Sequence, residues 1–357
     1  MHYSLVLLDA SSMLYAGHFS SSYTSRKDKI GSTISNNGLP IGGIRYVLNT
    51  ALDIIARGDD VLVVFDSHTD KNKLYAGYKG TRVKHTEIYI QQQMLLDAVR
   101  AIGIPYLKRD NYEADDLVAS AMKKYRGKYM SYKIYSGDSD LASNIRNDRT
   151  MLIGTADIYP TINKNNFETT VKKGSFIPYN TILPYYTIFG KKSNNVKQIA
   201  DTKTCVSLFE SFMSYSKASL TDAEDYTDIS HFAGWLANML ETDPASEAIV
   251  SELFNRTEYV FPRIDENLPD FVFPSAEDLN KRDLAFFLDL FNLEYLRPML
   301  NVLSEPSYEG SQRAEEYLKH YKADYFSGIL SADSNTVDKE LSITGNNTAF
   351  FADGDDF

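Results

Sequence analysis

The sequence predicts an α/β protein with a mainly parallel central sheet flanked by helices and followed by a helical C-terminal region. Two observations support this fold class. The apolar segments at 5–8 and 61–65 are short and continuous, as expected for parallel strands that are buried on both faces. Up to about residue 160, such strands alternate with amphipathic helical stretches, and this order favours a parallel sheet with right-handed crossovers.

Each element is predicted from its local pattern. Residues 132–136 alternate between apolar and polar side chains, which indicates a half-buried strand. Residues 115–125 place Leu117, Val118 and Ala121 on one face, which is typical of an amphipathic helix. The expected elements of this part are strands at 5–8, 61–65 and 132–136, helices at 44–55 and 115–125, and a polar loop at 18–40.

The rest of the chain divides into smaller regions. Apolar stripes such as Phe232, Leu236 and Leu240 predict ordinary core-facing helices between 225 and 303, and a further short helix is expected near 313–325. The expected regions are an α/β domain at 1–164 that includes a helical segment at about 67–95, a small helical unit at 165–215, a helical domain at 216–303 and an acidic polar tail at 304–357.

Acidic residues gather at two neighbouring places, Glu113-Ala114-Asp115-Asp116 and Gly137-Asp138-Ser139-Asp140. Like charges this close raise each other's pKa unless a cation lies among them. Carboxylate oxygens without a nearby Cys or His favour Mg²⁺ or Mn²⁺ over Zn²⁺. One Asp after a strand is usually a helix cap or turn residue, but this whole set indicates a site for one or two divalent ions. The predicted metal ligands are Asp9, Asp66, Glu113, Asp115, Asp116, Asp138 and Asp140.

Composition narrows the class of protein. The one cysteine, Cys205, excludes a disulfide framework and is typical of a reducing compartment. The apolar segment at 5–8 is too short for a secretory signal, and no segment approaches the ~18 apolar residues of a membrane span. We therefore expect a cytoplasmic protein without a membrane partner.

The net charge of −11 is unevenly distributed. Residues 1–200 contain 26 Lys and Arg and 18 Asp and Glu, whereas residues 201–357 contain 11 and 30. Solvated surface charge would explain either half but not their separation. The asymmetry favours a nucleic-acid-binding body with an acidic appendage.

Several motifs together resemble one known family. They are Leu8-Asp9-Ala10-Ser11-Ser12-Met13-Leu14-Tyr15, Phe65-Asp66, Tyr78-Lys79-Gly80-Thr81-Arg82 and the two acidic groups, in the order and spacing of the 5′-nuclease family. Over roughly residues 4–210 the chain resembles the 5′-nuclease domain of bacterial DNA polymerase I, the phage 5′-3′ exonucleases and ribonuclease H, and the flap endonucleases. The resemblance implies a PIN-like fold and metal-dependent hydrolysis of phosphodiesters.

The resemblance also assigns roles to the cationic stretch from Lys71 to Met94. Cations bind phosphates and aromatic rings stack on exposed bases, although an amphipathic surface helix has the same composition. The family forms a gateway here, at about 67–95, in which Lys79 and Arg82 contact the scissile phosphate. The predicted catalytic residues are Lys79, Arg82, Asp116 and Asp138. The predicted nucleic-acid-binding residues are Lys71, Lys73, Tyr78, Lys79, Arg82, Lys84, Lys191, Lys192, Lys197 and Lys203.

One stretch departs from the family pattern. Family members carry a later Gly-Asp-x-x-Asp-Asn whose aspartates complete a second metal site, but here the sequence reads Gly190-Lys191-Lys192-Ser193-Asn194-Asn195. The lysines could pair with the displaced carboxylates or with DNA. A second metal should bind weakly beside the neutral Asn194, and the helix–hairpin–helix unit within 165–215 is degraded because its glycines are missing.

The sequence therefore predicts a structure-specific 5′-nuclease of replication or repair, acting on 5′ flaps, nicks, ends or RNA paired with DNA, in a bacterial cytoplasm or phage-infected cell. It is expected to be a monomer. The alternative is a branched-DNA-binding or replisome-scaffolding protein that cleaves slowly or not at all; a PIN-type ribonuclease would lack the long cationic gateway. The acidic aromatic tail at 345–357 suits docking on a single-stranded-DNA-binding protein or a sliding clamp, or is disordered.

Overall fold

The computed structural model describes residues 3–27, 35–36, 38–75, 85–145, 147, 149–155, 161–167, 181–219, 229–302 and 312–322. Its centre is a mixed, mostly parallel sheet with the strand order β5-β4-β1-β6-β7-β8, in which only the β7–β8 pair is antiparallel. The strands are β1 (Ser4–Asp9), β4 (Asp60–Val64), β5 (Tyr106–Leu107), β6 (Ser131–Tyr135), β7 (Thr150–Ile153) and β8 (Ile162–Asn163), and β2 (Ser35–Asn36) pairs separately with β3 (Leu39–Pro40). The α/β fold class is confirmed.

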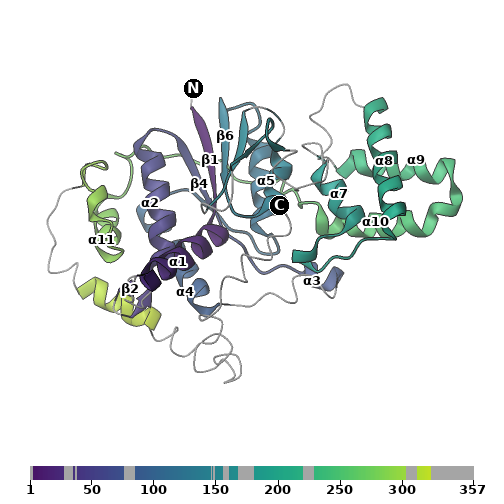
Figure 1. The fold of residues 1–357 in the computed structure, drawn as a ribbon. Coiled ribbons are helices and arrows are strands. Elements are labelled where there is room, and N and C mark those ends of the chain that lie inside the picture. The colour runs from purple at the N-terminus through teal and green to yellow at the C-terminus, as the bar shows by residue number, and fades with distance from the viewer. Residues whose placement is uncertain are drawn as a thin grey trace, which may run out of the picture.

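Helices cover both faces of the sheet, as Figure 1 shows. Val6 and Leu8 of β1 belong to the core beneath α1, α2 and α4, whereas Leu5 and Leu7 belong to the core on the α5 side. Because successive side chains of a strand point to opposite faces, a strand with two covered faces is apolar throughout. The bounds of these helices are α1 (Ala10–Lys27), α2 (Gly42–Ala56), α4 (Thr86–Ile102) and α5 (Ala114–Lys124).

A second group of helices lies beyond α5 (Figure 1). Trp235 is 1% exposed and packs against Phe212 and Phe232, so this group has an aromatic core that is continuous with the α5 side of the sheet. Its members are α7 (Ile182–Phe189), α8 (Thr202–Ser219), α9 (Ile229–Thr242) and α10 (Glu247–Val260), with the short α3 (Lys71–Leu74) against α10 and single turns η1 (Ser139–Asn144), η2 (Lys192–Asn194) and η3 (Pro244–Ser246).

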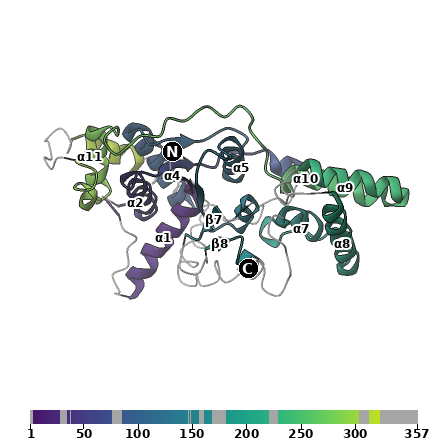
Figure 2. The same ribbon diagram turned by 90° about the horizontal axis from the view of Figure 1, so that it is seen from above.

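The chain then returns to the other side of the sheet. Figure 2 shows residues 261–280 crossing the molecule past α5 to α11 (Lys281–Leu290), and η4 (Glu294–Leu296) follows. The helix at 312–322 packs there too, where Tyr317 lies edge-on to Phe286 and Phe287 of α11. The helices expected at 216–303 are therefore divided between two places in the fold.

The structure corrects one expectation about helix length. The loop predicted at 18–40 was wrong for 18–27, which continue α1. Nearer its start, the same helix packs closely on α2, since a Cβ on Gly43 would lie 2.6 Å from the carbonyl oxygen of Leu14. In the segment predicted as a gateway at 67–95, α4 begins at Thr86 and its Met94 is fully buried in the core. Among the described helices, none combines the length and apolarity that a membrane span requires.

The return of the chain to α11 predicts a stability effect. Phe287 is 3% exposed and stacks on Phe291 at 5.7 Å, so Phe287→Ala is expected to lower the free energy of unfolding by about 3–5 kcal/mol. Phe254→Ala, at a phenylalanine that is 52% exposed on α10, should change it by less than about 1 kcal/mol. Urea unfolding followed by circular dichroism measures both values. A Phe287→Ala effect as small as that of Phe254→Ala would show that α11 does not belong to the core.

Candidate metal centre

The predicted metal ligands come together at one edge of the sheet. Asp9 is the last residue of β1, Asp66 closely follows β4, and Asp138 follows β6. Glu113 is the N-cap of α5, so Asp115 and Asp116 lie in the first turn of that helix. The carboxyl ends of parallel strands meet at a single edge, which is where α/β proteins bind their ligands.

Asp9 and Asp66 form the part of this edge that has no cationic side chain bound to it among the described residues. The Ser136 hydroxyl donates to Oδ2 of Asp9 at 2.6 Å, and the backbone N–H of Ser12 donates to Oδ1 at 3.1 Å. Oδ1 of Asp66 accepts the N–H of Ala114 at 2.8 Å. Burial and the nearby Asp66 carboxylate raise the pKa of Asp9 to about 7. A bound cation would relieve this repulsion.

Lys71 forms ion pairs in a second part of the edge. Its Nζ lies 2.8 Å from Oε2 of Glu113 and 3.0 Å from Oδ1 of Asp116, and its side chain is only 3% exposed. Burial disfavours the charged ammonium, but the carboxylates of Asp116 and Glu113 outweigh it and raise the pKa of Lys71. Asp116 also accepts the backbone N–H of Arg263 at 2.8 Å. The structure thus places Lys71 inside the acidic edge instead of on a surface that meets nucleic acid.

Lys191 forms ion pairs in the third part. Its Nζ lies 2.5 Å from Oδ1 of Asp140 and 3.3 Å from Oδ1 of Asp138. Burial opposes the charge here as well, yet the two carboxylates keep the pKa of Lys191 raised. Of the two roles predicted for this lysine, the structure shows the pairing with displaced carboxylates. At 6% exposure, its ammonium group is not on the surface as a DNA contact would require.

A narrow cavity of about 30 Å³ connects the two ion-paired groups. A space of this size holds one or two waters or a single ion. Asp115, Asp138 and Asp140 each offer a carboxylate oxygen, and these oxygens lie within 4.8 Å of one another. The residues that line the cavity include Lys71, Asp115, Asp116, Asp140, Asn194 and Tyr259.

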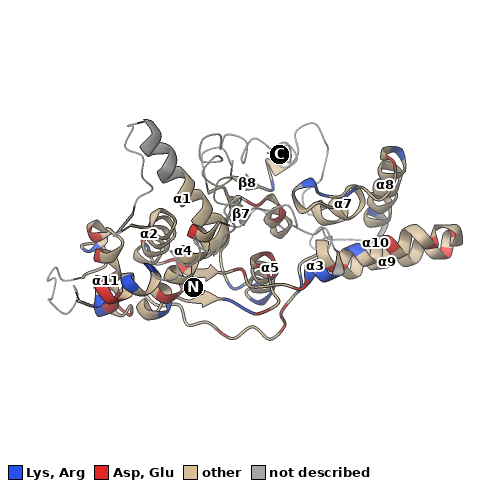
Figure 3. Ribbon diagram, turned by 90° about the horizontal axis from the view of Figure 1, so that it is seen from below, with Lys and Arg blue, Asp and Glu red and all other residues tan. Residues whose placement is uncertain are grey.

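The remaining predicted residues fall into two sets. Lys73, Lys192, Lys197 and Lys203 are described and exposed. They belong to α3, the turn after α7 and the start of α8, and Figure 3 shows Lys and Arg in these regions. The predicted gateway contacts Tyr78, Lys79, Arg82 and Lys84 lie outside the described residues.

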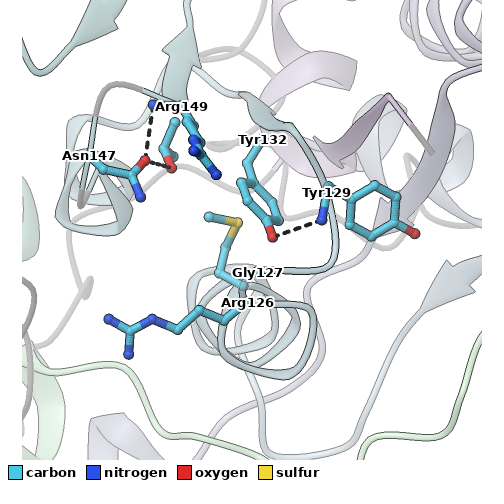
Figure 4. A pocket seen from close by; sticks show the side chains of 8 residues that line it. Arg126, Gly127, Tyr129, Tyr132, Asn147 and Arg149 are labelled. Carbon is cyan, nitrogen blue, oxygen red and sulfur yellow. Dashed lines mark hydrogen bonds between the residues drawn. The ribbon is translucent and has the colours of Figure 1, made fainter. Parts of the chain in front are cut away.

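A larger cavity of about 240 Å³ lies away from the acidic edge, near the amino ends of β6 and β7 (Figure 4). None of the predicted site residues lines it. Its lining is Met122, Arg126, Gly127, Tyr129, Tyr132, Asn147, Arg149 and Thr150. The acidic edge remains the candidate functional site.

Sequence reasoning missed three contacts at this edge. Nothing in the sequence signals that Ser136 bonds Asp9, because the bond joins residues 127 positions apart. The N–H of Arg263 on Asp116 is a backbone group and leaves no residue signature. The sequence did not signal the pairing of Lys71 either, because its partners lie 42 and 45 positions away.

Comparison with known proteins identifies relatives of this chain. Residues 4–172 match the family model described as 5′-3′ exonuclease, N-terminal resolvase-like domain. A 5′-3′ exonuclease of Aquifex aeolicus is 29% identical over 218 residues, which cover 58% of this chain and 70% of the relative. DNA polymerase I of Pseudomonas aeruginosa is 26% identical over 198 residues, which cover 54% of this chain and 20% of that enzyme.

Two solved structures match most of this chain at low sequence identity. The D15 protein of bacteriophage T5, co-crystallised with metal ions, is 14% identical, with a TM-score of 0.46 and coverage of 72% of this chain and 90% of that one. The catalytic core of Rad2 in complex with a DNA substrate is 13% identical, with a TM-score of 0.47 and coverage of 85% and 93%.

The Asp9–Asp66 pair generates a prediction for the metal-free protein. Asp9→Asn removes one of two repelling charges, so it should raise the free energy of unfolding in EDTA at pH 8 by about 1–2 kcal/mol. Folding raises the pKa of Asp9 from 3.8 to about 7. The folded state therefore binds the extra proton between these values, and this carboxyl makes wild-type stability fall as the pH rises through that window.

Thermal unfolding in EDTA and in Mg²⁺ at pH 5 and pH 8 measures the effect. Asp9→Asn should flatten the pH dependence and lose most of the stabilisation that Mg²⁺ gives to wild type. The control is Asp53→Asn, at an α2 acid whose partner is Arg57. A less stable Asp9→Asn protein at pH 8 in EDTA would contradict the crowding of charge at this pair.

Proposed function

We propose that this chain, whose residues 4–172 belong to the 5′-3′ exonuclease family of nucleases, is a metal-dependent 5′-nuclease that cleaves DNA at 5′ flaps, nicks and ends, or RNA paired with DNA. Relatives named 5′-3′ exonuclease and DNA polymerase I support a role in replication or repair. The observation that carries the proposal is the Asp9–Asp66 pair, two carboxylates that share one edge with no bound side-chain cation among the described residues.

The donor set at this pair fits Mg²⁺ or Mn²⁺. Its oxygens are carboxylate oxygens, which these hard cations prefer as ligands. Asp9 and Asp66 are the residues that would hold the ion. When bound, such an ion lowers the pKa of a water molecule and stabilises the negative charge that develops on a phosphodiester during hydrolysis.

The protein's own groups prepare this position. The Ser136 hydroxyl and the Ser12 N–H hold both oxygens of Asp9, which fixes the orientation of the carboxylate. The Ala114 N–H at the start of α5 fixes Asp66 in the same way. The gateway residues Lys79 and Arg82 would supply positive charge to the phosphate, as the resemblance to the family implies.

Exposed lysines beside the acidic edge suit the phosphate backbone of a substrate. Tyr75, at the end of α3, stacks on Tyr259 of α10 at 5.2 Å, and its hydroxyl donates to the carbonyl oxygen of Asn195 at 3.2 Å. This contact brings Lys73 near the turn that carries Lys192 and Lys197. Lysines on neighbouring elements bind phosphates without reading the base sequence.

A second candidate function is supported by the two ion-paired lysines. Lys71 and Lys191 hold four of the seven predicted metal ligands. With these ligands ion-paired to lysines, the chain would bind branched DNA and cleave it slowly or not at all. A labelled 5′ flap and a nicked duplex incubated with Mg²⁺, Mn²⁺ or EDTA separate the two functions: cleavage with either metal and none with EDTA supports the nuclease.

The C-terminal tail is the basis for proposing a protein partner in addition to nucleic acid. Residues 345–357 lie outside the described residues, and their acidic and aromatic composition supports docking on a single-stranded-DNA-binding protein or a sliding clamp. Deletion of this tail should spare cleavage of naked DNA.

The Asp9–Asp66 pair generates a prediction about catalytic activity. Asp66→Asn should lower single-turnover cleavage of a 5′ flap in Mg²⁺ by at least about 100-fold, because a charged ligand becomes neutral. DNA binding in EDTA should stay within about threefold of wild type. Asp70→Asn is the matched control, since Asp70 is exposed and pairs only with Lys73 among the described residues. Full activity of Asp66→Asn would remove the proposed mechanism.

The gateway residues predict a different division between rate and affinity. Lys79→Ala and Arg82→Ala should each slow the chemical step by about 100-fold while weakening DNA binding much less. Lys84→Ala, in the same segment, should instead weaken DNA binding and make the affinity for DNA less dependent on salt concentration. Single-turnover rates and fluorescence anisotropy measure the two quantities. If affinity alone falls in all three variants, Lys79 and Arg82 are phosphate anchors and take no part in the chemistry.

A further inference from the structure

We propose that the ammonium group of Lys191 is a built-in cation that takes the place of a divalent ion between Asp138 and Asp140, so that this nuclease works with a single divalent ion. The inference rests on the proposed function. It specifies how many divalent ions the nuclease binds and which cation lies between Asp138 and Asp140.

The contact distances support the replacement. The Nζ atom lies 2.5 Å from Oδ1 of Asp140 and 3.3 Å from Oδ1 of Asp138. These two residues and Asp115 offer carboxylate oxygens that lie within 4.8 Å of one another. A divalent ion at the same oxygens would lie within a few ångströms of the ammonium group and would be repelled by it. The ammonium and a divalent ion therefore compete for one position.

The local backbone holds Lys191 in place. The preceding Gly190 has a φ of +75°, and a Cβ there would lie 2.4 Å from the carbonyl oxygen of Val196. Lys191 forms an antiparallel bridge with Val196, whose N–H donates to the Lys191 carbonyl at 2.9 Å. Arg256 of α10 donates a hydrogen bond to the carbonyl oxygen of Lys197 at 2.7 Å and so holds the far end of this turn.

The side chain is enclosed as well. Lys191 is 6% exposed, and its Nζ lies 5.4 Å from the centre of the Tyr186 ring. A surface lysine could swing into solvent at little cost when a metal arrives. A buried lysine beside an aromatic ring loses these contacts and exposes its apolar stem when it leaves.

Lys71 supports the same conclusion from the other side of the edge. It binds Glu113 and Asp116 as Lys191 binds Asp138 and Asp140. Asp9 and Asp66, to which no described side-chain cation is bound, remain for a divalent ion. One such ion would add its charge to those of the two lysines.

The experiment counts ions on the full-length chain. Equilibrium dialysis against Mn²⁺ should give one bound ion per chain for wild type and two for Lys191→Met, in which methionine keeps most of the stem and removes the charge. Lys191→Arg retains the charge and should bind one ion. Lys192→Met changes the exposed neighbour and should also bind one.

Two results would overturn the inference: two ions in wild type, or one ion in a Lys191→Met protein whose circular dichroism is native. If Lys191→Met does not fold, the wild-type and Lys191→Arg counts still decide, because two ions in either chain contradict the replacement. Cleavage of a 5′ flap by the same samples tests the proposed function separately. If the wild-type chain binds one ion but does not cut the flap, the proposed nuclease function is wrong. If it cuts the flap and binds two ions, only the proposal about Lys191 is wrong.

Discussion

Repulsion among carboxylates at one edge of the sheet is the constraint on which the rest of this structure depends. Parallel strands bring Asp9, Asp66 and Asp138 together, and α5 adds three more acids. The structure balances this charge in different ways. Ser136 and backbone N–H groups hold Asp9, and Lys71 and Lys191 pair with the acids on either side. The crowding of Asp9 against Asp66 is the charge that remains for a metal ion to balance.

The helices outside the α/β domain take part in this balance. The turn that carries Lys191 is held by Arg256 of α10, and the N–H of Arg263, just beyond α10, bonds Asp116 directly. Farther along the segment that follows α10, the buried Asp265 forms an ion pair with Arg109, whose Nε lies 2.8 Å from the Asp265 carboxylate. The C-terminal helices therefore support the acidic edge as well as their own core. Substitutions in α10 are expected to reach the site through these contacts.

The sequence predicted those parts of the fold that depend on local pattern. The apolar runs at 5–8 and 61–65 became buried strands, and their terminal aspartates came together because parallel strands share a carboxyl edge. The length of α1 was not predictable from local pattern, because its second half is polar. The pairing of Lys71 depends on contacts across 42 and 45 residues, which composition does not reveal. At Lys191, the departure from the family indicated a changed second site, but only the structure places the ammonium group there.

Two lysines and one divalent ion are proposed to share the acidic edge. The most direct test is a crystal structure of the full-length chain grown in Mn²⁺, with an anomalous difference map collected at the manganese edge. One anomalous peak is expected, beside Asp9 and Asp66, with the Nζ of Lys191 still between Asp138 and Asp140. Two peaks, one of them between Asp138 and Asp140 with Lys191 turned away, would contradict it.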